Sequence, residues 1–124
     1  MVEEWIRRAK EFLDEAENTF ARKRYWLTCF HAQQAAEFIL KAVLLYRTGT
    51  YIFTHSLSEL ISAISALDEK IPDDVRVYAD ALEQHYTRAR YPGVHIKEYC
   101  EEDAKRCLRY ARRIFSFAME IVET

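Results

Sequence analysis

Apolar residues return at steps of three and four along most of the chain, the spacing that places them on one face of an α-helix. The first such stripe runs from Trp5 to Phe20 and predicts a helix of about five turns. A second helix is expected from Tyr25 to Arg47, where Thr48-Gly49-Thr50 supplies a stop signal.

Three further helices follow from the same spacing. Thr54 or Ser56 can cap a third helix, whose apolar stripe covers residues 57–67. Pro72 marks the start of a fourth, and acidic residues near Glu101 mark the start of the last. Strand-like alternation is not evident, so the pattern predicts an all-α fold, an antiparallel up-and-down helical bundle of four to five helices in a single domain over residues 1–124.

Composition places the chain among globular proteins. The 124 residues, half of them hydrophobic and 31% charged, suit one domain with one core. No apolar run is long enough to span a bilayer, and the first residues lack the basic start of a secretory signal. We therefore expect a soluble cytoplasmic protein that makes no membrane contact.

Charge is distributed unevenly along the chain. The net charge of −2 argues against a simple basic coat for nucleic acid. The segment from Arg88 to Arg113, however, contains eight basic residues and only four acidic ones. An anionic partner near this segment is one interpretation, and an ordinary solvated helix face is the other.

Few residues suggest metal or cofactor chemistry. Cys29, Cys100 and Cys107 include no CxxC pair, which argues against a disulfide framework and against a zinc knuckle, so we interpret them as core or incidental thiols. The chain has no glycine-rich phosphate loop and no HExxH motif. The sequence thus predicts no metal site and no cofactor.

The second helix combines polar and small residues in an unusual way. Gln33 and Gln34 would need hydrogen-bond partners if buried, and we expect them to fasten one helix to another or one subunit to its twin rather than to bind a ligand. Glu37 and Lys41 have the spacing of an ordinary surface ion pair. The glutamines, together with small residues that permit close packing, lead us to predict a homodimer; the small residues are Ala32, Ala35, Ala36 and Ala42.

The segment Arg90-Tyr91-Pro92-Gly93-Val94-His95 is the clearest break in the helical pattern. A cation and a titratable base on one loop suggest phosphate chemistry. Further residues that can hold phosphate or stack on a base lie just before it, with a solvated helix end as the alternative. The predicted ligand-binding residues are His85, Tyr86, Arg88, Arg90 and Tyr91.

Three segments in order resemble the HEPN domains, small helical proteins of bacteria and archaea. They are CFHAQQAAEFILKA from Cys29, THSLSEL from Thr54 and YTRARYP from Tyr86, and an amphipathic last helix follows them. The resemblance covers nearly the whole chain. It implies a helical bundle that commonly dimerises, that is often encoded beside a minimal nucleotidyltransferase as a toxin and antitoxin pair, and that in other members binds nucleotides.

Catalytic HEPN proteins resemble metal-independent ribonucleases that use an arginine, four to six further residues and then a histidine. Arg90 and His95 match that spacing and would be the catalytic residues, although Pro92-Gly93 puts a turn between them. Three functions follow. The first is a dimeric module that binds a nucleotide or RNA and acts with a partner such as a nucleotidyltransferase. The second is an endoribonuclease toxin, and the third is a non-catalytic structural or interaction module.

Overall fold

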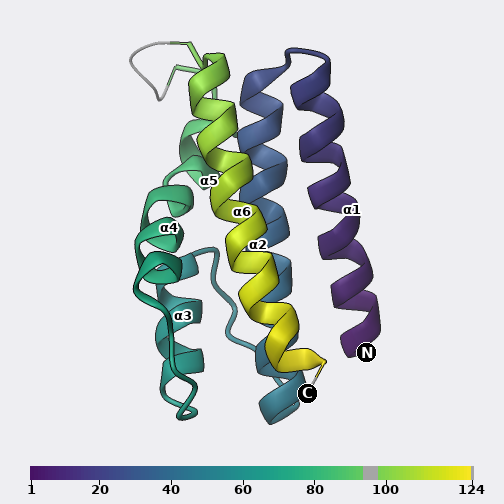
Figure 1. The fold of residues 1–124 in the computed structure, drawn as a ribbon, viewed down its shortest axis with the longest axis vertical. Coiled ribbons are helices and arrows are strands. Elements are labelled where there is room, and N and C mark those ends of the chain that lie inside the picture. Colours follow the sequence, from purple (N-terminus) through teal and green to yellow (C-terminus); the bar gives the residue numbers. More distant parts are fainter. Residues whose placement is uncertain (94–97, 124) are drawn as a thin grey trace.

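The computed structural model describes residues 1–93 and 98–123, and every regular element in this part of the chain is a helix (Figure 1). The all-α prediction is therefore confirmed. Five of the helices correspond to those expected, and α5 is an additional short turn that continues α4. The elements are α1 (Val2–Ala21), α2 (Tyr25–Thr48), α3 (Leu57–Ser65), α4 (Asp73–Glu83), α5 (His85–Arg88) and α6 (Glu101–Val122).

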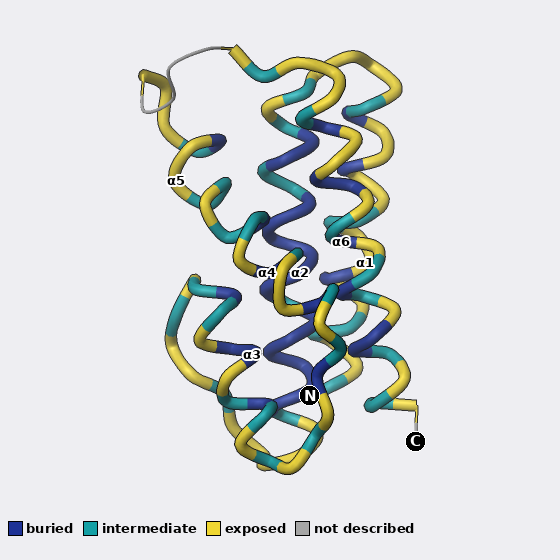
Figure 2. The backbone as a smooth tube through the Cα atoms, turned by 60° about the vertical axis from the view of Figure 1, so that its left-hand side comes forward, coloured by how far each residue is buried: buried dark blue, intermediate teal, exposed yellow. Residues whose placement is uncertain are grey.

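Helix α2 is the centre of the bundle and packs against every other helix. Figure 1 shows α2 and α6 running in the same direction, with α1 antiparallel to both and the shorter α3 and α4 on one side. Figure 2 shows buried residues along most of the length of α2. Nearly all sides of this helix are therefore covered by protein.

Local signals account for the helix ends. Ser56 caps α3, and its side chain accepts a hydrogen bond from the backbone N–H of Glu59 at 3.2 Å. Gly49 ends α2 in the left-handed region, with φ of 81°, as the stop signal predicted. At the start of α6 the Asp103 carboxylate accepts from the backbone N–H of Cys100 at 2.9 Å.

The features that suggested a homodimer are used inside the chain. Ala32, Ala35 and Ala36 are fully buried against neighbouring helices of the same chain. Gln33 is fully buried too, and it donates to the backbone carbonyl of His55 at 3.4 Å, which fastens α2 to the segment before α3. A dimer, which stays a prediction, would have to use another surface.

The interpretation of the cysteines as unpaired thiols is wrong for two of them. Cys29 on α2 and Cys107 on α6 form a disulfide with a Cα–Cα distance of 5.3 Å, whereas Cys100 is free and exposed. The two partners lie 78 residues apart in sequence. Only the packing of α2 against α6 brings them together, so spacing along the chain could not indicate the pair.

Over residues 1–93 and 98–123, none of the helices combines the length and the apolar character that crossing a bilayer requires.

Candidate functional site

Arg90 follows the short helix α5, and its guanidinium group lies between two aromatic rings. The Cζ atom is 4.3 Å from the ring centre of Tyr86 and 5.1 Å from that of Phe30. Both distances are typical of cation–π contacts. The Nε atom is buried, and no group in the described part of the chain accepts a hydrogen bond from it. The rings thus fix the cation in place without neutralising its charge.

Tyr86 connects Arg90 to a polar stripe on α2. Its ring stacks on His55, with ring centres 4.1 Å apart and planes 13° from parallel. His55 Nδ1 lies 3.2 Å from both carboxylate oxygens of Glu37, which also accepts a hydrogen bond from Lys41 Nζ at 3.0 Å. A continuous series of contacts therefore runs from the centre of α2 to Arg90.

The Glu37–Lys41 pair is buried, which corrects the expectation of a surface pair. Their side chains are only 3% and 7% exposed. Gln33, also buried, donates to Glu37 Oε1 at 3.3 Å, and Gln34 donates to Gln33 Oε1 at 2.7 Å. The sequence alone does not distinguish this buried pair from a surface pair, because Gln33 and Gln34, one turn before Glu37, are polar as well.

Arg90 also lines a hollow of about 550 Å³ between the α1–α2 turn and the chain on either side of the undescribed segment. The hollow presents three cationic side chains and one carboxylate, together with several aromatic rings. Trp26 is 48% exposed there. The lining residues are Lys23, Arg24, Tyr25, Trp26, Leu27, Ala89, Arg90, Pro92, Glu98 and Tyr99.

Sequence reasoning did not connect the α1–α2 turn with Arg90. The turn nevertheless carries a signal, because the basic run at residues 22–24 is followed directly by Tyr25 and Trp26. Basic residues beside aromatic ones are the combination that binds phosphate groups and stacks on bases. Its proximity to Arg90, however, depends on the fold.

The predicted ligand-binding residues divide into separate groups. Tyr86 and Arg90 are in contact, whereas Arg88 and Tyr91 are exposed and do not line the hollow. His85 does not line the hollow, but its Nδ1 atom is 2.7 Å from the hydroxyl of Tyr99, which does. Burial, reinforced by the charge of Arg88, lowers the pKa of His85 to about 4. His95 belongs to residues 94–97 and lies outside the described residues.

Comparison with protein-family models matches the chain to the HEPN domain over residues 2–122. The chain belongs to the HEPN family. The resemblance inferred from the three segments is thereby confirmed over almost the full length.

This HEPN protein is similar in sequence to a protein from an archaeon. A Methanocaldococcus jannaschii protein named "Putative toxin MJ1304" is 26% identical over 96% of this chain and 86% of the relative.

Three solved structures share the fold over nearly their full lengths. TT1696 from Thermus thermophilus is 31% identical, with a TM-score of 0.89 and 96% of each chain covered. An archaeal HEPN homologue, ST0689, is 32% identical, with a TM-score of 0.81 and 98% of each chain covered. A HEPN domain protein from Thermotoga maritima is 25% identical, with a TM-score of 0.79 and coverage of 97% of this chain and 98% of its own.

Proposed function

We propose that this HEPN protein binds RNA or a nucleotide in the hollow lined by Arg90. The observation that carries the proposal is the state of the Arg90 side chain. Its guanidinium lies against Tyr86 and Phe30, and its Nε atom has no acceptor among the residues that the structure describes. Although Nε itself is buried, Arg90 as a whole is only half-buried and lines the hollow, so a phosphate group there is the natural partner for the rest of its guanidinium.

The rest of the hollow supports the same ligand class. Lys23 and Arg24 add positive charge on the side formed by the α1–α2 turn, and a single carboxylate, Glu98, opposes them. Tyr25 and Trp26 supply rings on which a base can stack. Phosphate contacts together with base stacking are characteristic of single-stranded RNA recognition.

Fluorescence anisotropy with a labelled single-stranded RNA tests the proposal. Arg90→Ala should weaken binding at least tenfold, since one charge-assisted contact is worth roughly 1.5–3 kcal/mol. The salt dependence should also fall, by about 0.7 in the slope of log affinity against log salt concentration. Arg76→Ala is the matched control, because Arg76 is an exposed arginine that bonds to Ser65 on the α3–α4 side and lines no part of the hollow. Equal affinities for wild type and Arg90→Ala would contradict the proposal.

A metal-independent endoribonuclease toxin is the second candidate function. The name of the M. jannaschii relative favours it, and so does the spacing of Arg90 and His95. In this mechanism His95 would take a proton from a ribose 2′-hydroxyl, and Arg90 would stabilise the charge that develops on the phosphorus oxygens. Binding and cleavage would then share Arg90.

Incubation of cellular RNA with the purified protein in excess EDTA separates the two functions. Cleavage by wild type that disappears in His95→Ala would identify a ribonuclease. RNA binding without cleavage would leave a binding module. Cleavage that persists in His95→Ala would exclude the proposed catalytic role of that residue.

The family resemblance also suggests partners, namely a second copy of the chain and a minimal nucleotidyltransferase. Light scattering at micromolar concentration tests the first, and a mass near twice 14.7 kDa is the expected result. A monomer would contradict a homodimer. Co-purification with a nucleotidyltransferase encoded beside this chain tests the second.

A further inference from the structure

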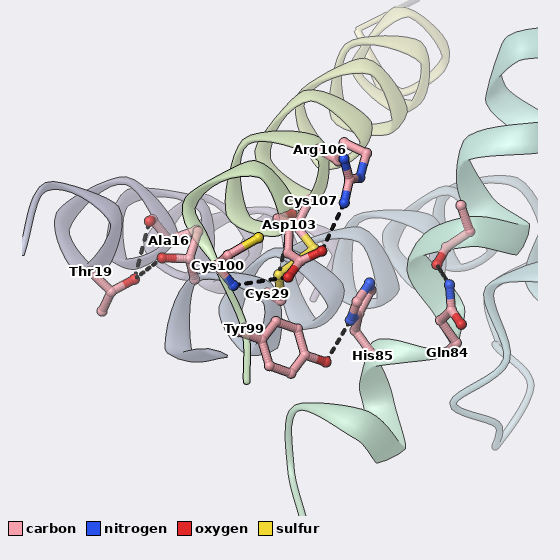
Figure 3. The surroundings of a disulfide bond; sticks show 12 residues. Ala16, Thr19, Cys29, Gln84, His85, Tyr99, Cys100, Asp103, Arg106 and Cys107 are labelled. Carbon is pink, nitrogen blue, oxygen red and sulfur yellow. Dashed lines mark hydrogen bonds and ion pairs between the residues drawn. A yellow bond between two sulfur atoms is a disulfide. The ribbon is translucent and has the colours of Figure 1, made fainter. Parts of the chain in front are cut away.

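Three potential metal ligands come together from three helices. Cys29 on α2, Cys107 on α6 and His85 on α5 place their sulfur and nitrogen ligand atoms within 4.8 Å of one another. Figure 3 shows the two sulfurs beside the His85 ring. Both cysteines are buried. In the oxidised chain the sulfurs bond to each other, so neither is a thiolate that could bind a metal.

We propose that in the reduced chain Cys29, Cys107 and His85 form a binding site for Zn²⁺ or a similar thiophilic metal ion. Two thiolates and one imidazole are a common zinc ligand set, and a water molecule would complete the tetrahedron. Two sulfurs on one tetrahedral zinc lie about 3.8 Å apart, given a Zn–S distance of about 2.3 Å. Small side-chain rotations of two cysteines with a Cα–Cα distance of 5.3 Å can reach that separation.

The surroundings of His85 suit a metal ligand. Its Nδ1 atom is 2.7 Å from the Tyr99 hydroxyl, which leaves Nε2 for the metal. Histidine ligands usually make such a hydrogen bond with their second nitrogen, because it fixes the tautomer and the orientation of the ring. With the metal on Nε2, the Nδ1–H group would donate to Tyr99. Burial and the charge of Arg88 lower the pKa of His85, only partly opposed by Asp103, so the imidazole is neutral and able to bind a metal at pH 7.

A thiol reagent can convert the disulfide form of the chain into the metal-binding form. A dithiol that reduces the disulfide passes two electrons and two protons to the sulfurs and becomes a disulfide itself. Zn²⁺ then displaces the two thiol protons as it binds. A small-molecule disulfide can reverse the process by taking two electrons from the thiolates, which releases the metal as the Cys29–Cys107 bond forms again. Metal and disulfide therefore exclude each other.

Cobalt is a suitable probe, because Co²⁺ bound to thiolates in a tetrahedral site absorbs strongly in the near ultraviolet and visible. The full-length protein, reduced with a phosphine, is titrated with Co²⁺ and then with Zn²⁺. We expect sulfur-to-cobalt charge-transfer absorption that saturates at one Co²⁺ per chain and disappears when Zn²⁺ is added. The oxidised protein should give no such absorption.

Matched variants assign the ligands. Cys107→Ser should abolish the absorption, whereas Cys100→Ser should retain it, because Cys100 is exposed and outside the cluster. His85→Ala should weaken binding at least tenfold and shift the visible bands. Circular dichroism checks that each variant folds, and a thiol assay on the unfolded chain confirms that all three cysteines are reduced.

Three results would overturn the proposal. One is the absence of charge-transfer absorption in fully reduced wild type. Another is the same absorption in Cys107→Ser, and the third is an unchanged spectrum and affinity in His85→Ala.

Discussion

The guanidinium of Arg90 lies 4.3 Å from the ring centre of Tyr86, and the same ring stacks on His55 with the two ring centres 4.1 Å apart. The position of the Arg90 guanidinium therefore depends on Tyr86. The ring of Tyr86 is in turn stacked on His55, which contacts the Glu37 carboxylate. The arrangement links Arg90 to the buried centre of α2.

Tyr86→Leu should weaken RNA binding several-fold, because Arg90 loses one of its two ring contacts and its side chain becomes less ordered. Tyr86→Phe should bind almost as tightly as wild type, since the ring is retained. Anisotropy measurements on both variants provide the check. Equal affinities for the leucine and phenylalanine variants would show that the ring does not position Arg90.

Glu37→Gln should lower the free energy of unfolding by about 3 kcal/mol, because it leaves the buried Lys41 ammonium without a charged partner. Lys41→Met should be destabilising for the corresponding reason. If the two groups stabilise each other, the double variant will lose less stability than the sum of the single losses. Urea denaturation gives the three values.

Glu11→Gln is the control for this experiment. Glu11 pairs with Arg7 four residues away, as Glu37 does with Lys41, but on the exposed face of α1. Its substitution should change stability little. A loss as large as that of Glu37→Gln would mean that burial is not the cause.

His31 should make stability depend on pH. Burial lowers the pKa of His31 below 6.5, an effect that the charge of Glu15 only partly opposes, and its Nδ1 atom has no partner among the described residues. The unfolded chain therefore takes up the proton near pH 6.5, while the folded chain resists it until lower pH. Stability contributed by neutral His31 is present above pH 6.5 and is lost as the pH falls through the folded-state pKa.

His31→Phe should flatten the stability profile between pH 7 and pH 5, because the group that titrates is removed. The measurement is the free energy of unfolding of both proteins across that range. His85, whose pKa is also lowered, contributes equally to both profiles and cancels in the difference. Parallel profiles would show that His31 is protonated to the same extent in the folded and unfolded chains.

Loss of the disulfide should reduce stability by about 2 to 4 kcal/mol, the range typical of native crosslinks that close long loops. Cys107→Ser, unfolded with a chelator present, should show this decrease, and Cys100→Ser should not. A reductant should lower the stability of wild type and leave Cys107→Ser unchanged. Insensitivity of wild type to the reductant would contradict a stabilising disulfide.

The sequence predicted the helices well because their signals are local. The stripe from Trp5 to Phe20, the stop at Gly49 and the cap at Ser56 each depend on residues only a few positions apart. Glu37 and Lys41 were wrongly predicted to lie on the surface, because i,i+4 spacing is the same for an exposed ion pair and a buried one. The difference lies in what packs around α2.

The candidate site was only partly predictable for the same reason. Arg90 and Tyr86 are four residues apart on one short stretch, so their association follows from local geometry. Trp26 joins them only through the packing of α2 against α5, and Cys29 meets Cys107 only through the packing of α2 against α6. Such contacts are set by the tertiary fold.

The most direct test of the RNA-binding account uses the fluorescence of Trp26 in a Trp5→Phe variant. Trp5 packs against Phe38 and Tyr51 outside the hollow, so the variant leaves Trp26 as the only tryptophan and a reporter within the hollow. Single-stranded RNA should quench this fluorescence in a saturable way, and Arg90→Ala should raise the RNA concentration needed for half-maximal quenching at least tenfold. RNA that binds by anisotropy but leaves Trp26 fluorescence unchanged would show that the RNA occupies another surface.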